Sequence, residues 1–374
     1  MNRVTRSLTD SRFDCWLASA CMPSGMVLKL LEAFGSPEDC YLAVEKHDEA
    51  VSGILTPRFY RMLSESCRDE TLIKYGKKLE QHSIRSVLFT DPLYPESLKD
   101  LRDPPPVLFY QGNLECAGGR TLCMVGSRAA SYSGQKAARK LACDLGTKGV
   151  TIISGMASGI DAAAHRGCME GKSPTVAVLG CGLDKPYPAD NIPLRDDILK
   201  NGGLVLSEYA PGEKAAGWHF PVRNRIIVGL SKALILIEAR IRSGSMTSVS
   251  HALEQGKDVF VYPGDPASES FEGNHQLLRE GGIYFTSARD ILEDMHWLDN
   301  PPAVRHNSDC AQETITRTPE EEKVIKALKP GSLSFEQLLS HTGMSPSVLM
   351  STLTILQIRG MAEAMPGKQY QIMQ

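Results

Sequence analysis

The sequence has 374 residues, of which 42% are hydrophobic and 23% are charged, and its formal net charge is -3. This length favours two or three domains with a sizeable core, and the composition is typical of an ordinary globular protein. The slightly acidic balance excludes a basic coat over the whole surface, although it leaves room for a local basic pocket.

Membrane insertion and secretion are not expected. No apolar run approaches the length of a membrane span, and the amino terminus lacks the apolar core of a signal peptide after Arg3 and Arg6. We therefore expect a cytoplasmic protein without membrane contact. The ten cysteines form no CxxC pair, which disfavours a zinc ribbon or a redox motif and favours buried thiols.

Residues 1–85 have a helical pattern. One helical face is apolar through Phe13, Trp16, Leu17 and Ala20. A second helix ends at Gly35, and Ser36 with Pro37 then supplies the cap and the first-turn proline of a third. Two interpretations stay open: a SAM-like or helix-hairpin-helix-like unit whose turn amides hold a DNA phosphate, and a small helical packing domain. The scarcity of basic residues at the turns favours the second.

Residues 86–112 change to a strand pattern. Apolar runs at 86–89 and 107–110 are separated by Tyr94-Pro95 and by three prolines at 104–106. Prolines confined to the start of a run are typical of the entry to a sheet.

From residue 121 to about 296, short apolar runs alternate with helical segments. Six of them predict buried strands, at 122–125, 150–153, 176–179, 203–206, 233–237 and 259–261. This alternation predicts an α/β fold with an extended Rossmann-like, doubly wound sheet. Most runs end in small or polar residues, so a row of loops is expected on the rim where such sheets bind ligands.

The first of these loops contains Gly126, Ser127 and Arg128, and a helical pattern begins near Gly134. A dinucleotide fingerprint requires a glycine where Arg128 stands, which disfavours a nicotinamide cofactor. An arginine at a strand end can instead pair with a phosphate through its guanidinium, assisted by loop N–H groups.

The second loop contains Ser154 and Gly155, and Gly159 opens the helix that follows. Asp161 is expected to cap that helix at its amino end. Asp161 and His165 are four residues apart and could supply two metal ligands, but no third ligand is evident. We expect neither a metal nor a cofactor.

The segment 220–225 concentrates basic residues next to an aromatic ring. Phe220 is followed by Arg223, Asn224 and Arg225, just before an expected apolar helix at 226–230. Ion pairs on a solvated face would explain either arginine alone. Two arginines beside aromatic residues favour contact with nucleic acid, because bases stack on rings while cations follow phosphates.

A further turn, Ser243-Gly244-Ser245, follows the fifth run and precedes a helix at 249–255. Its N–H groups suit a phosphate. Glu208 and Glu238 each end a strand and could be catalytic carboxylates, but no nucleophile and base accompany them.

Residues 297–317 carry Pro301-Pro302 and no apolar period, which predicts a linker. Residues 318–374 contain three short helical patterns followed by two strand-like segments, which indicates a winged helix. Its charge is close to neutral, whereas a winged helix that reads duplex DNA usually has a strongly basic face. Protein contact or spacing is therefore favoured over duplex reading.

Several of these segments together resemble the DprA (Smf) family of DNA-processing proteins. The resemblance covers about 85–296 and rests on motifs in one order, which include VGSRAASYSG, ISGMASGIDAAAH, VAVLGCGLDKPYP, FPVRNRIIVGLS and IEARIRSGSMTS. It implies a non-enzymatic protein that binds single-stranded DNA, forms a homodimer and loads the recombinase RecA during natural transformation.

The resemblance also implies which residues bind DNA. Gly126, Ser127 and Arg128 match one DNA-binding loop, and Phe220, Arg223, Asn224 and Arg225 match a second stretch. Ser154, Gly155, Gly159 and the turn Ser243-Gly244-Ser245 match loops that line the pocket. Arg128, Arg223 and Arg225 are expected to clamp phosphates.

The alternative is an enzyme similar to nucleoside-monophosphate phosphoribohydrolases, which share the sheet and a glycine-rich phosphate loop. Those enzymes resemble PGGxGTxxE at that loop, with the glutamate as a catalytic carboxylate. Here the turn reads SGSMTSV, and Val249 occupies the place of the acid.

Overall fold

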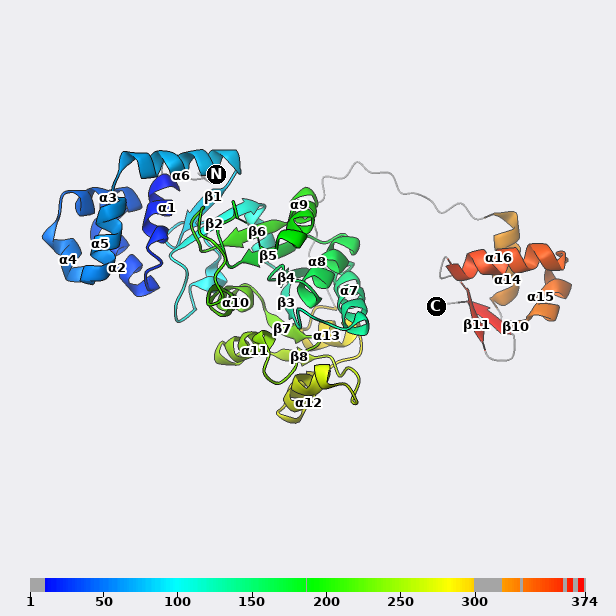
Figure 1. The fold of residues 1–374 in the computed structure, drawn as a ribbon. Helices are drawn as coiled ribbons and strands as arrows, with labels where there is room; N and C mark the ends of the chain where they lie inside the picture. Colours follow the sequence, from blue (N-terminus) through cyan, green and yellow to red (C-terminus); the bar gives the residue numbers. More distant parts are fainter. Residues whose placement is uncertain are drawn as a thin grey trace. The chain divides into compact units, whose positions relative to one another are not determined.

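The computed structural model describes residues 11–185, 187–298, 318–329, 332–358, 362–365 and 369–372. The chain forms two compact units, residues 1–304 and 305–374 (Figure 1). Among the described residues no helix combines the length and the apolar character needed to cross a membrane. The finer division into 1–85, 86–296, 297–317 and 318–374 stays a prediction, and most of the expected linker, 299–317, lies outside the described residues.

From residue 11 to residue 81 the described chain forms six helices. They are α1 (Ser11–Ser19), α2 (Ser24–Phe34), α3 (Pro37–Glu45), α4 (Glu49–Ile54), α5 (Pro57–Ser66) and α6 (Asp69–Gln81). The apolar face predicted for α1 is confirmed, because its Phe13, Trp16 and Leu17 are buried against the neighbouring helices. The Ser36 hydroxyl accepts the Asp39 N–H at 3.1 Å, as expected for the cap of α3.

A nine-stranded sheet follows. Its strands are β1 (Arg85–Leu88), β2 (Val107–Gly112), β3 (Thr121–Val125), β4 (Thr151–Ser154), β5 (Thr175–Leu179), β6 (Leu204–Ser207), β7 (Ala233–Leu236), β8 (Val259–Val261) and β9 (Ile283–Tyr284). The order across the sheet is β1-β2-β6-β5-β4-β3-β7-β8-β9. Strand β2 is antiparallel to both of its neighbours, β1 and β6, and all other neighbouring strands are parallel. The six predicted strands are confirmed. Strand β9 was missed because a two-residue strand leaves no periodicity in the sequence.

Helices cover both faces of the sheet, as the predicted doubly wound fold requires (Figure 1). One face carries α7 (Tyr132–Gly146), α8 (Ile160–Glu170), α9 (Ile192–Lys200) and α13 (Ala288–Asp294); the other carries α10 (His219–Gly229), α11 (Gly244–Glu254) and α12 (Glu272–Arg279). The short 3-10 helices are η1 (Glu96–Leu98), η2 (Leu114–Ala117), η3 (Ala189–Asn191) and η4 (Glu269–Phe271).

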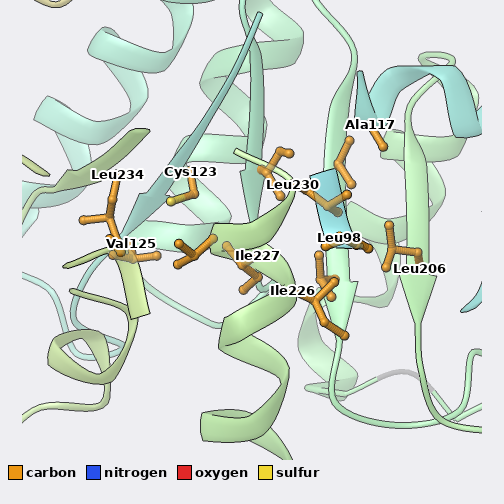
Figure 2. Packing of buried hydrophobic residues seen from close by; sticks show 14 of the residues in the cluster. Leu98, Ala117, Cys123, Val125, Leu206, Ile226, Ile227, Leu230 and Leu234 are labelled. Carbon is orange, nitrogen blue, oxygen red and sulfur yellow. The ribbon is translucent and has the colours of Figure 1, made fainter. Parts of the chain in front are cut away.

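Alternating side chains of each strand supply both cores. In β3, Leu122 and Met124 pack toward α7 and α8, whereas Cys123 and Val125 pack toward α10. Figure 2 shows the second core, in which Ile226, Ile227 and Leu230 lie against the strands. Parallel strands buried on both faces read as continuous apolar runs, which is why they were detectable in the sequence.

Most described cysteines behave as small apolar side chains. The buried ones are Cys15, Cys40, Cys116, Cys123, Cys168 and Cys181, whereas Cys21 is exposed. Cys310 lies outside the described residues.

The second unit has the predicted winged-helix fold. Its elements are α14 (Pro319–Leu328), β10 (Leu333–Ser334), α15 (Phe335–Thr342), α16 (Pro346–Ile358), β11 (Ala362–Met365) and β12 (Gln369–Ile372). The three strands form a sheet in the order β10-β12-β11. Val324, Leu338, Leu353 and Leu356 form the centre of its apolar core.

Candidate nucleic-acid interface

The carboxyl ends of the parallel strands form one rim of the sheet. Strand β3 lies between β4 and β7, so the strand order reverses at β3 and β7. In open α/β sheets the loops beside such a reversal are the usual ligand site. The loops after β3, β4 and β7 lie beside this reversal, and the loops after β5 and β6 continue the same rim. Together with the first turns of α10 and α11 they define the candidate interface, which we call the carboxyl rim.

Glycines allow the loops of the carboxyl rim to approach one another closely. The Ser127 N–H donates to the Glu238 carbonyl at 2.7 Å, and the Ile160 N–H donates to the Ser127 carbonyl at 3.2 Å. A side chain at Gly126 would collide with Ile160, and one at Gly159, where φ is 79°, would collide with the Ser127 carbonyl. These two glycines bring the β3 loop against α8 and leave Arg128 at the surface.

The side chain of Glu238 already occupies the amino end of α7. The Glu238 carboxylate is fully buried and accepts the Ser131 N–H at 3.0 Å and the Ser131 hydroxyl at 2.6 Å. The Ser131 hydroxyl in turn accepts the Gly134 N–H at 3.0 Å, and a side chain at Gly134 would collide with the carboxylate. This helix end therefore has no room for the phosphate of a nucleotide, and Glu238 has a capping role that the sequence did not reveal.

Arg128 lies beside two aromatic rings at the carboxyl rim. Its guanidinium carbon is 4.8 Å from the centre of the half-buried Phe220 ring. The Phe220 ring centre is in turn 5.7 Å from that of Tyr187, an exposed residue of the loop after β5. A cation and two rings from three separate segments are the groups that hold a phosphate and its base.

Arg223 points into the protein. It is 4% exposed, and its Nη1 donates to the Gly155 carbonyl at 2.9 Å and to the Val178 carbonyl. A side chain at Gly155 would collide with this guanidinium. Burial lowers the pKa of Arg223 to about 10, against the opposing effect of the Asp161 carboxylate. The direct phosphate contact expected for Arg223 does not fit this placement, because its guanidinium already joins α10 to the loop after β4 and to strand β5.

Asp161 does not cap α8 through its side chain, so that expectation is wrong. Gly159 is the cap residue, and no side chain caps the helix. Asp161 Oδ2 instead accepts the N–H groups of Gly155 at 3.2 Å and Ala157 at 3.3 Å. Burial raises the pKa of Asp161, while Arg223 and these N–H groups lower it. Through these two hydrogen bonds the carboxyl group fixes the conformation of the loop after β4.

Arg225 is already paired. Its two terminal nitrogens donate to the Glu208 carboxylate at 2.7 and 2.6 Å, and its Nε donates to the Asp103 carbonyl at 2.9 Å. Both side chains are mostly buried, at 11% and 14% exposed. This fork leaves Arg225 little freedom to clamp a phosphate, and it gives Glu208 a structural partner.

The remaining predicted residues lie where α10 meets α11. The segment 220–225, expected to precede a helix, lies inside α10 because the helix begins at His219. The Asn224 amide is 3.5 Å from the Gly244 carbonyl. Ser243 precedes the first residue of α11, and its hydroxyl is buried without a hydrogen-bond partner among the described residues. Ser245 is buried in the first turn, so this turn offers backbone rather than side chains to a ligand.

His165 is a buried, uncharged residue rather than a member of a metal site. Its Nδ1 lies 2.8 Å from the Thr175 hydroxyl, which donates its own proton to the Ile152 carbonyl at 2.6 Å. Nδ1 must therefore be the donor to Thr175, and burial lowers the pKa of His165 to about 3. In the described part of the chain no cluster of three His, Cys, Asp or Glu side chains could hold a metal.

A large cavity, which no sequence pattern indicated, lies near the amino ends of β3, β7 and β8. Its volume is about 1310 Å³, and its walls include the segment 93–103, η2 and the last turns of α10 and α11. Its lining mixes acidic side chains with basic ones such as Lys232 and Lys257. The Lys257 ammonium donates to the carbonyls of Val228 and Gly229, at 2.5 and 3.1 Å. None of the predicted site residues lines it except Arg225.

Comparison with known proteins gives a consistent result. Residues 85–296 match the family model for DNA recombination-mediator protein A, and residues 309–368 match that for the DprA winged helix domain. The DNA processing protein DprA of Streptococcus pneumoniae is 38% identical over 281 residues, which are 75% of this chain and 96% of that protein. Protein Smf of Escherichia coli is 34% identical over 293 residues, which are 77% and 78% of the two chains.

Solved structures of related proteins resemble the fold. The X-ray structure of DprA from Streptococcus pneumoniae has a TM-score of 0.65 at 35% identity and covers 78% of this chain and 99% of its own. A structure that describes the single-stranded DNA binding mode of DNA processing protein A from Helicobacter pylori has a TM-score of 0.52 at 27% identity. It covers 57% of this chain and 95% of its own.

Proposed function

The chain belongs to the DNA recombination-mediator protein A family, and from this premise we propose that it binds single-stranded DNA at the carboxyl rim. The observation that carries the proposal is the exposed Arg128 guanidinium 4.8 Å from the Phe220 ring. Cations that follow phosphates and rings that accept bases are the two elements of sequence-tolerant binding to single strands. The structure that describes single-stranded DNA binding by the Helicobacter pylori relative supports the same ligand.

The predicted site residues divide into two roles in this proposal. Arg128 contacts a phosphate directly, Phe220 offers its ring to a base, and the N–H groups around Gly244 and Ser245 assist. Arg223, paired Arg225 and the glycines at 126, 155 and 159 hold the loops in position. Only a few phosphates are neutralised per protomer, so the affinity falls with salt along a modest slope.

The wider role that we propose is a non-enzymatic recombination mediator in the cytoplasm. The protein acts as a homodimer, loads RecA onto the bound strand and serves natural transformation. Dimerisation gives the complex two rims and adds avidity along one strand. Family membership supports this role.

Arg128→Ala tests the site. The variant should bind a fluorescent single-stranded oligonucleotide about tenfold more weakly, because it loses a charge-assisted contact worth about 1.4 kcal/mol. Fluorescence anisotropy measures the affinity. Arg61→Ala, which removes the same charge from exposed α5, is the matched control and should bind as the wild type does. Equal affinity of all three proteins would refute the site.

An enzyme similar to nucleoside-monophosphate phosphoribohydrolases remains the alternative, and the site argues against it. The two carboxylates at strand ends of this protein already have hydrogen-bond partners. Glu238 accepts the Ser131 hydroxyl at the amino end of α7, and Glu208 accepts Arg225. Incubation with adenosine monophosphate and chromatography of the products decides between the two, because release of free adenine would overturn the binding-module proposal.

A further inference from the structure

Large aromatic side chains are exposed around the carboxyl rim. Tyr132 is 84% exposed, Trp218 is 59% exposed and Tyr187 is 50% exposed. A tyrosine with almost its whole ring in water contributes little to the core, and exposed apolar groups that gather in one region mark contact surfaces. Exposure of these three rings indicates a contact surface rather than a contribution to the core.

The three rings come from different loops of the same rim. Trp218 closes the loop after β6, Tyr187 lies in the loop after β5, and Tyr132 begins α7 just after the β3 loop. In the sheet these strands occur in the order β6-β5-β4-β3. Neighbouring strands lie about 4.8 Å apart, so β6 and β3 are about 14 Å apart, which gives room for more than one nucleotide.

Ring contacts place two of the three side chains, Tyr187 and Trp218, next to α10. The Tyr187 ring centre is 5.7 Å from that of Phe220. The Arg128 guanidinium lies 4.8 Å from the centre of the same Phe220 ring. The Trp218 ring meets buried His219 edge to face, with 4.0 Å between the ring centres. His219 is fixed by the Gly180 carbonyl at 3.0 Å. The loop that carries Trp218 is thereby held next to the Phe220 turn.

The charge of these loops suits the same ligand. Lys185 and Lys214 are exposed in the loops after β5 and β6, and Arg128 is exposed after β3. Basic groups that alternate with exposed rings are the arrangement that binds a strand whose bases are unpaired. Duplex DNA would not use such rings, because its bases are stacked inside the helix.

We propose that Trp218, Tyr187 and Tyr132 are base-stacking platforms which extend the single-stranded DNA site across the carboxyl rim from the β6 loop to the β3 loop. This inference rests on the proposed function. It assigns the bases to these rings and leaves the phosphates to Arg128, Lys185 and Lys214. Stacking does not depend on base identity, so the platforms bind any sequence.

The test compares two single-stranded oligonucleotides of equal length, oligothymidine and one made of abasic sites, by fluorescence anisotropy. Trp218→Ala and Tyr132→Ala should each weaken oligothymidine binding fivefold or more and leave the abasic affinity unchanged. Trp218→Phe and Tyr132→Phe keep a ring and should retain most of the affinity. Leu253→Ala removes an exposed apolar side chain from the far end of α11 and should change neither.

Two results would overturn the stacking role of these rings. Unchanged oligothymidine affinity in both alanine variants overturns the inference, and so does an equal loss on both oligonucleotides, since a base platform cannot act where there is no base. Arg128→Ala separates the two proposals, because it should weaken both oligonucleotides. If the wild-type protein binds neither oligonucleotide, the proposed function itself fails.

Discussion

Among single residues, Glu238 occupies the place at the end of α7 where nucleotide-binding sheets hold a phosphate. Its carboxylate satisfies the Ser131 N–H and hydroxyl, and Gly134 leaves it room. The sequence showed only an acid at a strand end. Its capping role could not be predicted, because Ser131 and Glu238 are 107 residues apart in the chain.

Glu238→Ala should lower the free energy of unfolding by about 1–3 kcal/mol, because it leaves the partly buried N–H and hydroxyl of Ser131 without their partner. Urea unfolding followed by circular dichroism measures the change. Glu293→Ala is a suitable control, because the pair that this glutamate forms with Arg289 on α13 is exposed. If Glu238→Ala is as stable as that control, Glu238 has no capping role.

His165 makes the stability of the first unit depend on pH. Burial holds its pKa at about 3 in the folded protein, whereas an exposed histidine has a pKa near 6.5. The unfolded chain therefore binds the proton more tightly, and stability falls as the pH drops below about 6.5 toward 3. One such group contributes at most about 1.4 kcal/mol per pH unit.

The urea midpoint of the wild-type protein should accordingly be lower at pH 5 than at pH 7. His165→Gln cannot take up that proton and should show a smaller difference between the two pH values. If the difference is the same in both proteins, the pH dependence comes from other groups.

At the scale of elements, α10 joins the outer and inner parts of the site. Phe220 on its first turn faces the carboxyl rim, whereas Arg223 reaches the carbonyls of Gly155 and Val178 inside. The sequence predicted the right segment but placed it before a helix. Residues 219–225 show no regular alternation of polar and apolar positions, because His219 and Arg223 are buried although they are polar. The start of α10 could therefore not be recognised from hydrophobic periodicity.

Salt dependence distinguishes the two arginines. Arg128→Ala should reduce the slope of log affinity against log salt by about 0.7, because one phosphate contact with a single strand is lost. Arg223→Met should leave the slope unchanged and lower the free energy of unfolding by about 3 kcal/mol, because buried carbonyls and Asp161 lose their partner.

Anisotropy titrations at several salt concentrations measure the slope, and urea unfolding measures the stability. A reduced slope in Arg223→Met would mean that its guanidinium reaches the DNA and that the direct clamp first expected for it is right.

In the whole molecule, the predictable part was the doubly wound sheet and the rim where its loops gather. Runs such as 122–125 and 176–179 are buried on both faces of the sheet, so all of their residues are apolar and they can be recognised as strands. The antiparallel addition of β1 and β2 next to β6, the two-residue β9 and the cavity beneath α10 and α11 depend on contacts between distant segments. The loops were predictable as a group, but which arginine faces outward was not, because Arg128 and Arg223 look alike in sequence.

The central claim is that a single strand of DNA lies on the carboxyl rim. Photo-crosslinking with an oligonucleotide that contains 5-iododeoxyuridine, followed by mass spectrometry of the digested protein, tests it directly. Crosslinks should fall on peptides that contain Tyr187 and the segment 218–220, and Arg128→Ala should reduce their yield. Crosslinks confined to the winged-helix unit or to the walls of the large cavity, with no effect of Arg128→Ala, would contradict the claim.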